Sequence, residues 1–206
     1  MGHEYMEMKN TSAAIQAYRR AIEVDERDYR AWYGLGQTYE MLKQPQYAFY
    51  YFKRAAALRP FDSRMWCALA NCYEMSGQID NAIACYERAL CGSRESEQIA
   101  TSRLGRLYES IGKDDTAAHY YKTLCDKIGK DDAHMEEISN ALIFLARHQQ
   151  KLGQPDVSEQ YLRIVIDAQG PQTEAAKAML RAIRSASTNK SDTSDRARPP
   201  NRAQLS

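Results

Sequence analysis

The side chains that could do chemistry in this sequence are four histidines, five cysteines and many carboxylates. The histidines are His3, His119, His134 and His148. They are scattered, with no pair at metal-ligand spacing, and no two cysteines form a C-x-x-C motif. No glycine-rich phosphate-binding turn is found either, since Gly34 and Gly36 lie in a helical pattern. The sequence therefore predicts no catalytic centre, no metal site and no cofactor.

Cysteine usage and net charge narrow the class of protein. The cysteines are Cys67, Cys72, Cys85, Cys91 and Cys125. Their odd number and their place in apolar or helical runs are typical of reduced thiols in a nuclear or cytoplasmic protein. The chain carries 28 basic and 27 acidic residues, a net charge of +1, so we expect no nucleic-acid partner. No stretch approaches the roughly 18 apolar residues of a membrane span, so we expect no membrane partner.

A strict internal repeat dominates the sequence. Trp32 and Trp66 are separated by 34 residues, and the same separation relates many other matching positions. These positions include Leu35 and Leu69, Tyr39 and Tyr73, Phe52 and Tyr86, and Ala55 and Ala89. The same step backwards leads from Ala48 to Ala14. A period of this length is typical of helical repeat arrays.

Residues 29–62 form the most complete unit of the repeat. Trp32, Leu35 and Tyr39 recur at three- and four-residue spacing, which predicts the apolar face of a first helix. Gly36 is small where a second, antiparallel helix must approach closely. The unit resembles the tetratricopeptide repeat at each of its characteristic positions. This resemblance implies an all-α fold, a right-handed superhelical solenoid of antiparallel helix pairs with a C-terminal capping helix.

The repeat register divides the chain into units. We expect a truncated repeat at 1–28, full repeats at 29–62, 63–96 and 98–131, a degenerate repeat at 139–172, a capping helix at 173–185 and a disordered tail at 186–206. Asp132–Glu137 reads as an insertion that the pattern does not explain. The tail has almost no apolar residues with which to offset the entropy of ordering. Because Met1 falls in the middle of a first helix, we expect the sequence to be the C-terminal piece of a longer protein.

The variable positions carry a closer resemblance. The runs at residues 1–24, 27–40 and 58–66 closely resemble the family of the eighth subunit of the anaphase-promoting complex, also called the cell division cycle protein 23 family. The resemblance implies a non-catalytic scaffold of a large mitotic ubiquitin ligase, located in the nucleus and cytoplasm. It implies other subunits and coactivator C-box peptides as partners. It also implies a homodimer that forms through N-terminal repeats absent from this sequence, so we expect no dimer through this fragment.

The tetratricopeptide resemblance also places a groove on the first helix of each unit. Its second, fifth, ninth and twelfth positions are predicted to face a peptide. These residues are Arg30, Tyr33, Gln37, Glu40, Arg64, Cys67, Asn71, Glu74, Ser102, Arg106 and Glu109. Glu40, Glu74 and Glu109 share one position in successive units and are predicted to form an acidic strip suited to an Arg-bearing peptide. Ordinary solvated helix residues, paired with neighbouring arginines, are the alternative interpretation.

Two other functions compete with this one. A tetratricopeptide co-chaperone grips a terminal carboxylate with Lys, Arg and Asn, and the repeated glutamates argue against that ligand. An assembly scaffold that only spaces other subunits is the other alternative, and it predicts that mutating the glutamates leaves binding unchanged.

The run at residues 47–52 contains more aromatic side chains than one helix face can bury. Phe52 belongs to the core by register. We predict that Tyr50 or Tyr51 points outward, either as a contact for another subunit or as an ordinary surface tyrosine.

Overall fold

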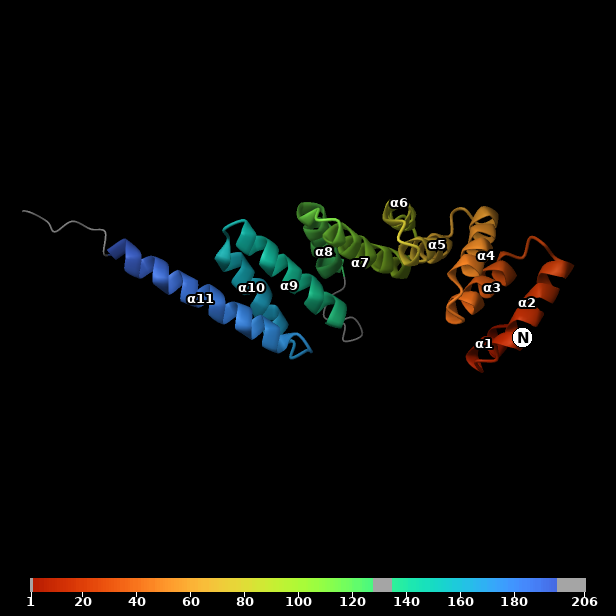
Figure 1. Ribbon diagram of the computed structural model, residues 1–206, viewed down its shortest axis with the longest axis horizontal. Coiled ribbons are helices and arrows are strands. Elements are labelled where there is room, and N and C mark those ends of the chain that lie inside the picture. Colours follow the sequence, from red (N-terminus) through yellow and green to blue (C-terminus); the bar gives the residue numbers. More distant parts are fainter. Residues whose placement is uncertain (1, 128–134, 196–206) are drawn as a thin grey trace, which may run out of the picture. The chain divides into compact units, whose positions relative to one another are not determined.

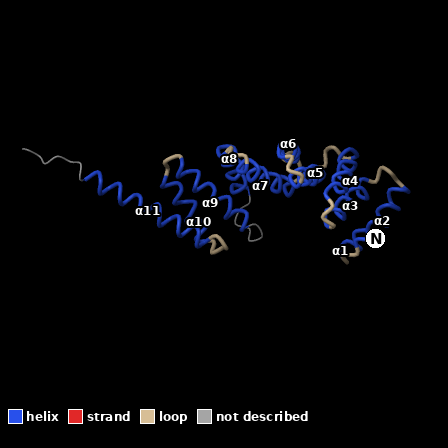
Figure 2. The backbone as a smooth tube through the Cα atoms, in the orientation of Figure 1, coloured by secondary structure: helices blue, strands red, loops and turns tan. Residues whose placement is uncertain are grey.

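The computed structural model describes residues 2–127 and 135–195, and the side chains of residues 2–127 and 136–185. All regular elements in these ranges are helices (Figures 1 and 2). They are α1 (Gly2–Glu7), α2 (Thr11–Val24), α3 (Tyr29–Met41), α4 (Pro45–Leu58), α5 (Ser63–Met75), α6 (Ile79–Ala89), α7 (Arg94–Ser110), α8 (Asp114–Lys127), α9 (Met135–Lys151), α10 (Pro155–Asp167) and α11 (Thr173–Asp195). The chain divides into two compact units, Met1–Tyr120 and Tyr121–Ser206.

The core of the first unit repeats with the predicted period. The small residues Ala14, Ala48 and Ala82 are all fully buried. The large residues at the next matching position, Tyr18, Phe52 and Tyr86, are 5%, 0% and 1% exposed. Helices α3 and α4 pack together, as do α5 and α6, and each second helix also packs on the first helix of the following pair. The helix pairs and their hydrophobic register are therefore those that the sequence predicts.

Close helix approach explains the small residues of the first helices. A Cβ built on Gly36 would lie 2.5 Å from two ring atoms of Phe52, so the glycine lets the ring of α4 rest against the backbone of α3. Gly34 does the same for the ring of Tyr18 in α2. These two glycines pack helices, as their positions in the repeat predict.

The two tryptophans are less buried than the predicted apolar face implies. Trp32 and Trp66 are only partly buried and pack on the margin of the core. Each indole Nε1 donates to a loop carbonyl six residues earlier, Trp32 to Glu26 and Trp66 to Pro60, both at 2.8 Å. A polar N–H with a partner at the surface suits a half-exposed indole. The tryptophans therefore fasten each first helix to the loop that precedes it.

Helix ends follow local chemistry that also repeats. Asp28 and Asp62 cap α3 and α5 by accepting the backbone N–H groups of Arg30 and Arg64 at 3.0 and 3.1 Å. The turn between the two helices of a pair contains one residue in the left-handed conformation. This residue is Lys9, Lys43, Gly77, Gly112 or Gly153 in successive turns. The same turn geometry recurs in each helix pair, so the turn requires a residue with positive φ even where that residue is not glycine.

The second unit contains a smaller three-helix core. Helix α10 packs on both α9 and α11. The core residues are Leu142, Ile143, Ala146, Leu162, Val165, Ala176 and Ile183. Ser158 occupies the small position of the predicted degenerate repeat, and its buried Oγ donates to the carbonyl of Ala146 at 2.8 Å. The predicted last pair and the additional helix thus share one apolar core.

Three boundaries differ from the sequence expectation. Helix α7 begins at Arg94 and not near residue 98, because the Ser93 side chain caps it. Residues 132–134 lie outside the described residues, and the rest of the expected insertion belongs to the first turn of α9. Helix α11 continues to Asp195, past the expected end at Ser185. The disordered tail was expected at 186–206, but residues 186–195 belong to α11, and residues 196–206 lie outside the described part.

Candidate peptide-binding groove

The predicted groove residues lie on the first helices α3, α5 and α7 of three successive pairs. On α3, residues 30, 33, 37 and 40 follow three- and four-residue steps, so they share one face of the helix. Trp32 and Tyr39 lie on the opposite face at about 100° per residue. Helix α5 packs against α7, so the first helices of these two pairs are neighbours.

Four of the predicted residues surround one hollow. Arg30, Tyr33 and Gln37 of α3 and Arg64 of α5 line a space of about 480 Å³. The remaining lining residues are His3, Tyr29, Met65 and Glu95. Sequence reasoning missed these four, although Tyr29 and Met65 directly precede or follow a predicted groove position. A hollow between two successive first helices can hold one or two side chains of an extended peptide.

The two arginines of this hollow have carboxylate partners at their own helix ends. Arg64 makes a two-pronged contact with Asp62, at 3.0 Å from Nε and 2.7 Å from the second guanidinium nitrogen. This contact holds the pKa of Asp62 below its usual value. Arg30 lies 3.7 Å from Asp28 in a looser version of the same pair. The positive charges of both arginines in the hollow are therefore already balanced by aspartates, and a ligand anion would have to compete with them.

Tyr33 supplies the aromatic wall of the hollow. Its ring centroid lies 5.4 Å from that of Phe52, which fixes the ring against the core. Burial raises the pKa of the Tyr33 hydroxyl, so this group stays a neutral donor at physiological pH. Gln37, one turn further along α3, adds an amide that can bond to a peptide backbone.

The predicted acidic strip has a second role in the structure. The Asn71 side-chain amide donates to Glu40 Oε1, a bond that joins α3 to α5. Glu74 accepts the hydroxyl of Tyr86 at 3.2 Å and pairs with Arg103 at 3.4 Å, which joins α5 to α7. Glu40 and Glu74 thus link successive helix pairs, and a ligand arginine would share them with these donors.

Two of the predicted residues are poorly placed for direct contact with a ligand. Ser102 is only 6% exposed, so little of its side chain could meet a ligand. Cys67 is partly buried, its Sγ donates to the carbonyl of Ser96 at 3.6 Å, and burial raises its pKa to about 11. Arg106 and Glu109 are exposed on α7. The structure thus gathers the N-terminal half of the predicted groove more closely than its C-terminal half.

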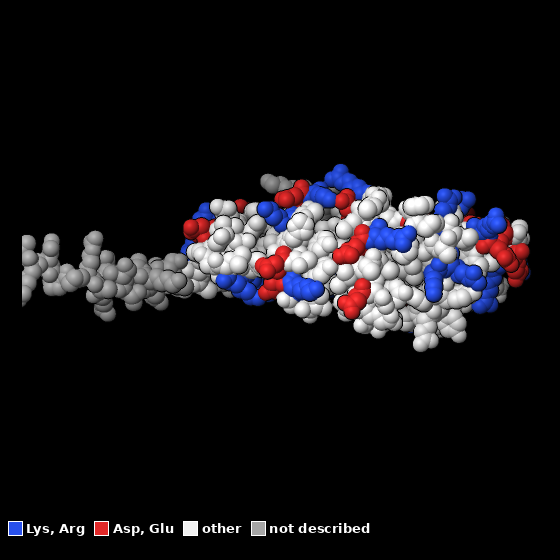
Figure 3. All heavy atoms as spheres, turned by 90° about the horizontal axis from the view of Figure 1, so that it is seen from above, with Lys and Arg blue, Asp and Glu red and all other residues white. Residues whose placement is uncertain are grey.

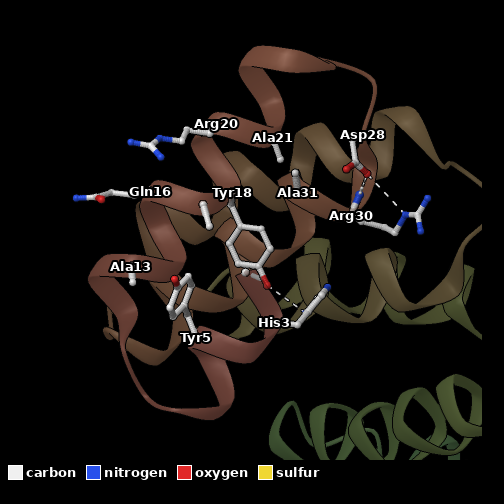
Figure 4. A pocket seen from close by; sticks show the side chains of 12 residues that line it. His3, Tyr5, Ala13, Gln16, Tyr18, Arg20, Ala21, Asp28, Arg30 and Ala31 are labelled. Atoms are coloured by element: carbon white, nitrogen blue, oxygen red, sulfur yellow. Dashed lines mark hydrogen bonds and ion pairs between the residues drawn. The ribbon is translucent and has the colours of Figure 1, made fainter.

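A second hollow lies beside the first, between α1, α2 and the start of α3 (Figure 4). It has a volume of about 530 Å³. The hydroxyl of Tyr18 points toward His3 and lies 3.1 Å from its Nδ1, whereas Gln16 and Arg20 point away. Arg30 borders both hollows. The two spaces therefore share one charged boundary.

Within the described residues, no cluster of His, Cys, Asp or Glu has the arrangement of a metal site. Among the same residues, no helix combines the length and the apolar character needed to cross a bilayer.

Comparison with known proteins identifies the same repeat, and it finds similarity to the same subunit in two organisms. Models of the tetratricopeptide repeat match residues 1–63, 63–91 and 100–136. The chain is 43% identical over 107 residues to anaphase-promoting complex subunit 8 of Arabidopsis thaliana, covering 52% of this chain and 18% of the relative. It is 47% identical over 118 residues to subunit 8 of Dictyostelium discoideum, covering 57% of this chain and 19% of the relative. The chain thus spans less than a fifth of these relatives.

Solved structures support the fold at lower identity. The crystal structure of MamA matches with a TM-score of 0.69 and 20% identity, covering 87% of this chain and 97% of that one. The crystal structure of YrrB, described as a repeat protein with an unusual peptide-binding site, matches with a TM-score of 0.67 and 18% identity, covering 87% and 88%. At these identities the likeness shows the helical repeat fold alone.

Proposed function

The chain belongs to the tetratricopeptide-repeat family, and we propose that it is a non-catalytic scaffold segment of an anaphase-promoting complex subunit 8. Its matches to subunit 8 of two distant organisms support this proposal, although they cover about half of the chain. Other subunits of that complex are the proposed partners, with the nucleus and cytoplasm as the proposed location. A homodimer through this segment is not part of the proposal.

We further propose that the segment binds an extended peptide along α3 and α5. One observation carries this proposal: the hollow of about 480 Å³ is lined by Arg30, Tyr33, Gln37 and Arg64, residues from two successive repeats at the positions expected for a groove. Tyr33 offers a fixed aromatic wall, and Gln37 offers an amide for the peptide backbone. A coactivator C-box peptide, which carries an arginine, is the proposed ligand. Its arginine would meet Glu40 at the far end of the α3 face.

Fluorescence anisotropy of a labelled C-box peptide tests this proposal. We expect saturable binding that Tyr33→Ala and Gln37→Ala each weaken by about tenfold, since each removes a contact in the hollow. Gln150→Ala, an exposed substitution on α9, is the matched control and should leave binding unchanged. Absence of binding to a folded protein, or equal binding by all variants, would contradict the proposed site.

The co-chaperone alternative has one observation on its side, the two arginines in the same hollow. Both are paired with aspartates of their own helix caps, so a terminal carboxylate would have to compete with Asp28 and Asp62. A labelled peptide ending in a free aspartate, titrated beside an amidated copy, separates the two functions. Binding that requires the free carboxylate would favour the co-chaperone.

A further inference from the structure

A cluster of aromatic rings covers the side of α3 that faces away from the groove. The ring of Tyr39 stacks between those of Tyr47 and Tyr51, with centroids 5.2 and 5.3 Å away. Tyr50 lies edge-on to Tyr51 at 5.2 Å and to Trp32 at 6.3 Å. The five rings form one continuous layer that is fixed by mutual contact. Tyr39 is nearly buried, but Tyr47 and Tyr50 are 57% and 50% exposed.

Two arginine side chains contact this layer of rings. The Arg54 guanidinium lies 5.7 Å from the ring centroid of Trp32 and 5.9 Å from that of Tyr50. Arg19 of α2 donates to the hydroxyl of Tyr39 at 3.2 Å. The ring faces orient the Arg54 guanidinium, and the bond to Tyr39 holds that of Arg19, so both groups keep further N–H donors for a ligand. We call Arg19, Trp32, Tyr47, Tyr50, Tyr51 and Arg54 the aromatic–arginine face.

The two helices that carry these arginines contain more basic than acidic residues, although the loop between α2 and α3 adds Asp25, Glu26 and Asp28. Among the described ion pairs, none includes Arg19 or Arg54, or the neighbouring Arg20 and Lys53. Helix α4 contains Lys53 and Arg54 and no acidic residue, and α2 contains Glu23 as its one acid. Figure 3 shows Lys and Arg side chains, with Asp and Glu side chains among them, over the part of the molecule that carries α1–α4. Three other arginines of the same unit, Arg30, Arg64 and Arg103, have carboxylate partners.

We propose that the aromatic–arginine face is a second binding surface, separate from the groove, that takes an acidic segment of another polypeptide. Carboxylates of the segment pair with Arg19 and Arg54, whose planar donors are already oriented by the Tyr39 hydroxyl and by the Trp32 and Tyr50 rings, respectively. Apolar side chains between these carboxylates lie on the exposed faces of Tyr47 and Tyr50. Tyr, Trp and Arg are the residues that most often dominate binding energy at protein interfaces.

A polypeptide fits this face better than a nucleic acid. The net charge of +1 gives no extended positive field of the kind that phosphate backbones require.

The test uses the full chain and a fluorescein-labelled peptide of about twelve residues in which glutamates alternate with leucine and proline. Anisotropy in about 50 mM NaCl should show saturable binding, and a peptide with glutamine in place of glutamate should not bind. The variant Arg19→Gln/Arg54→Gln should weaken binding at least tenfold. Tyr50→Ser should weaken it several-fold with an unchanged dependence on salt, since this residue contributes apolar contact and not charge.

Matched controls keep the result specific to this face. Lys122→Gln/Arg147→Gln removes two exposed cations of the second unit, and Tyr33→Ala alters the groove; neither should change the affinity. Circular dichroism melts establish that each variant is folded. No binding by the wild-type chain, equal loss in both double variants, or displacement of the peptide by oligothymidine at similar concentrations would overturn the proposal.

Discussion

The bond between Asn71 and Glu40 allows a direct test of what the repeated glutamates do. Asn71→Ala removes the donor and leaves a partly buried carboxylate without it. A hydrogen bond to a charged group is worth about 1.5–3 kcal/mol when buried, and partial exposure places this one at the lower limit. We expect the free energy of unfolding to fall by about 1.5 kcal/mol, or about 5 °C in Tm.

A second substitution gives the same test a pH signature. Asn71→Asp places two carboxylates in contact, so the variant should be less stable than Asn71→Ala at pH 7. Lowering the pH allows one carboxyl to bind a proton, which replaces repulsion with a hydrogen bond. The folded state then binds that proton more tightly than the unfolded state, so stability relative to wild type rises as the pH falls from about 7 to about 4.

The measurement is thermal unfolding followed by circular dichroism at several pH values. Glu40→Gln combined with Asn71→Asp exchanges donor and acceptor and should restore most of the stability at pH 7. If Asn71→Ala melts within about 1 °C of wild type and Asn71→Asp shows no pH dependence, the reasoning is wrong. Glu40 would then be a solvated carboxylate with its full capacity available to a ligand.

Three further outcomes follow from particular contacts. Gly36→Ala should lower the free energy of unfolding by about 1–2 kcal/mol in urea unfolding. The new methyl group would overlap the Phe52 ring, and the cost of that overlap should exceed the gain in helix propensity. Replacing the ring by Phe52→Leu should reduce the cost. Lys43→Gly should raise the stability by about 1 kcal/mol in the same assay, because φ at this position is +57°; a loss of stability would contradict the turn geometry. An alkylating reagent at about pH 8, with labelling followed by mass spectrometry, should modify the exposed Cys91 of the folded chain first. Cys72 should react slowly, because burial raises its pKa to about 12. Rapid labelling of the Cys91→Ser variant at its remaining cysteines would refute this order.

The hydrophobic framework could be predicted from the sequence because it depends on residue size at fixed intervals. Ala14, Ala48 and Ala82 mark places where helices nearly touch, and a larger side chain there would separate them. The residues that fill the space beside them, such as Phe52 and Tyr86, repeat for the same reason. The spacing of small and large residues therefore predicts which helices pair, and this spacing can be determined from a single sequence.

The surroundings of the candidate groove residues could be predicted only in part. Helical periodicity correctly places Arg30, Tyr33 and Gln37 on one face of α3, because that face depends on spacing within one helix. The partner of Glu40 depends on the offset between α3 and α5, which spacing within a repeat does not give. The burial of Ser102 likewise depends on how α7 packs against its neighbours, which the spacing within one repeat does not give.

The bonds from Glu40 to Asn71 and from Glu74 to Arg103 also have an evolutionary consequence. Each bond spans two repeats, so neither repeat can change its half without a matching change in the other. Duplication or deletion of a single repeat would separate the two residues of such a pair. The apolar core would tolerate the same change, because its residues are similar in every repeat. Among homologues, these positions should vary together, and the order of the repeats should be inherited more strictly than the shared tetratricopeptide pattern requires.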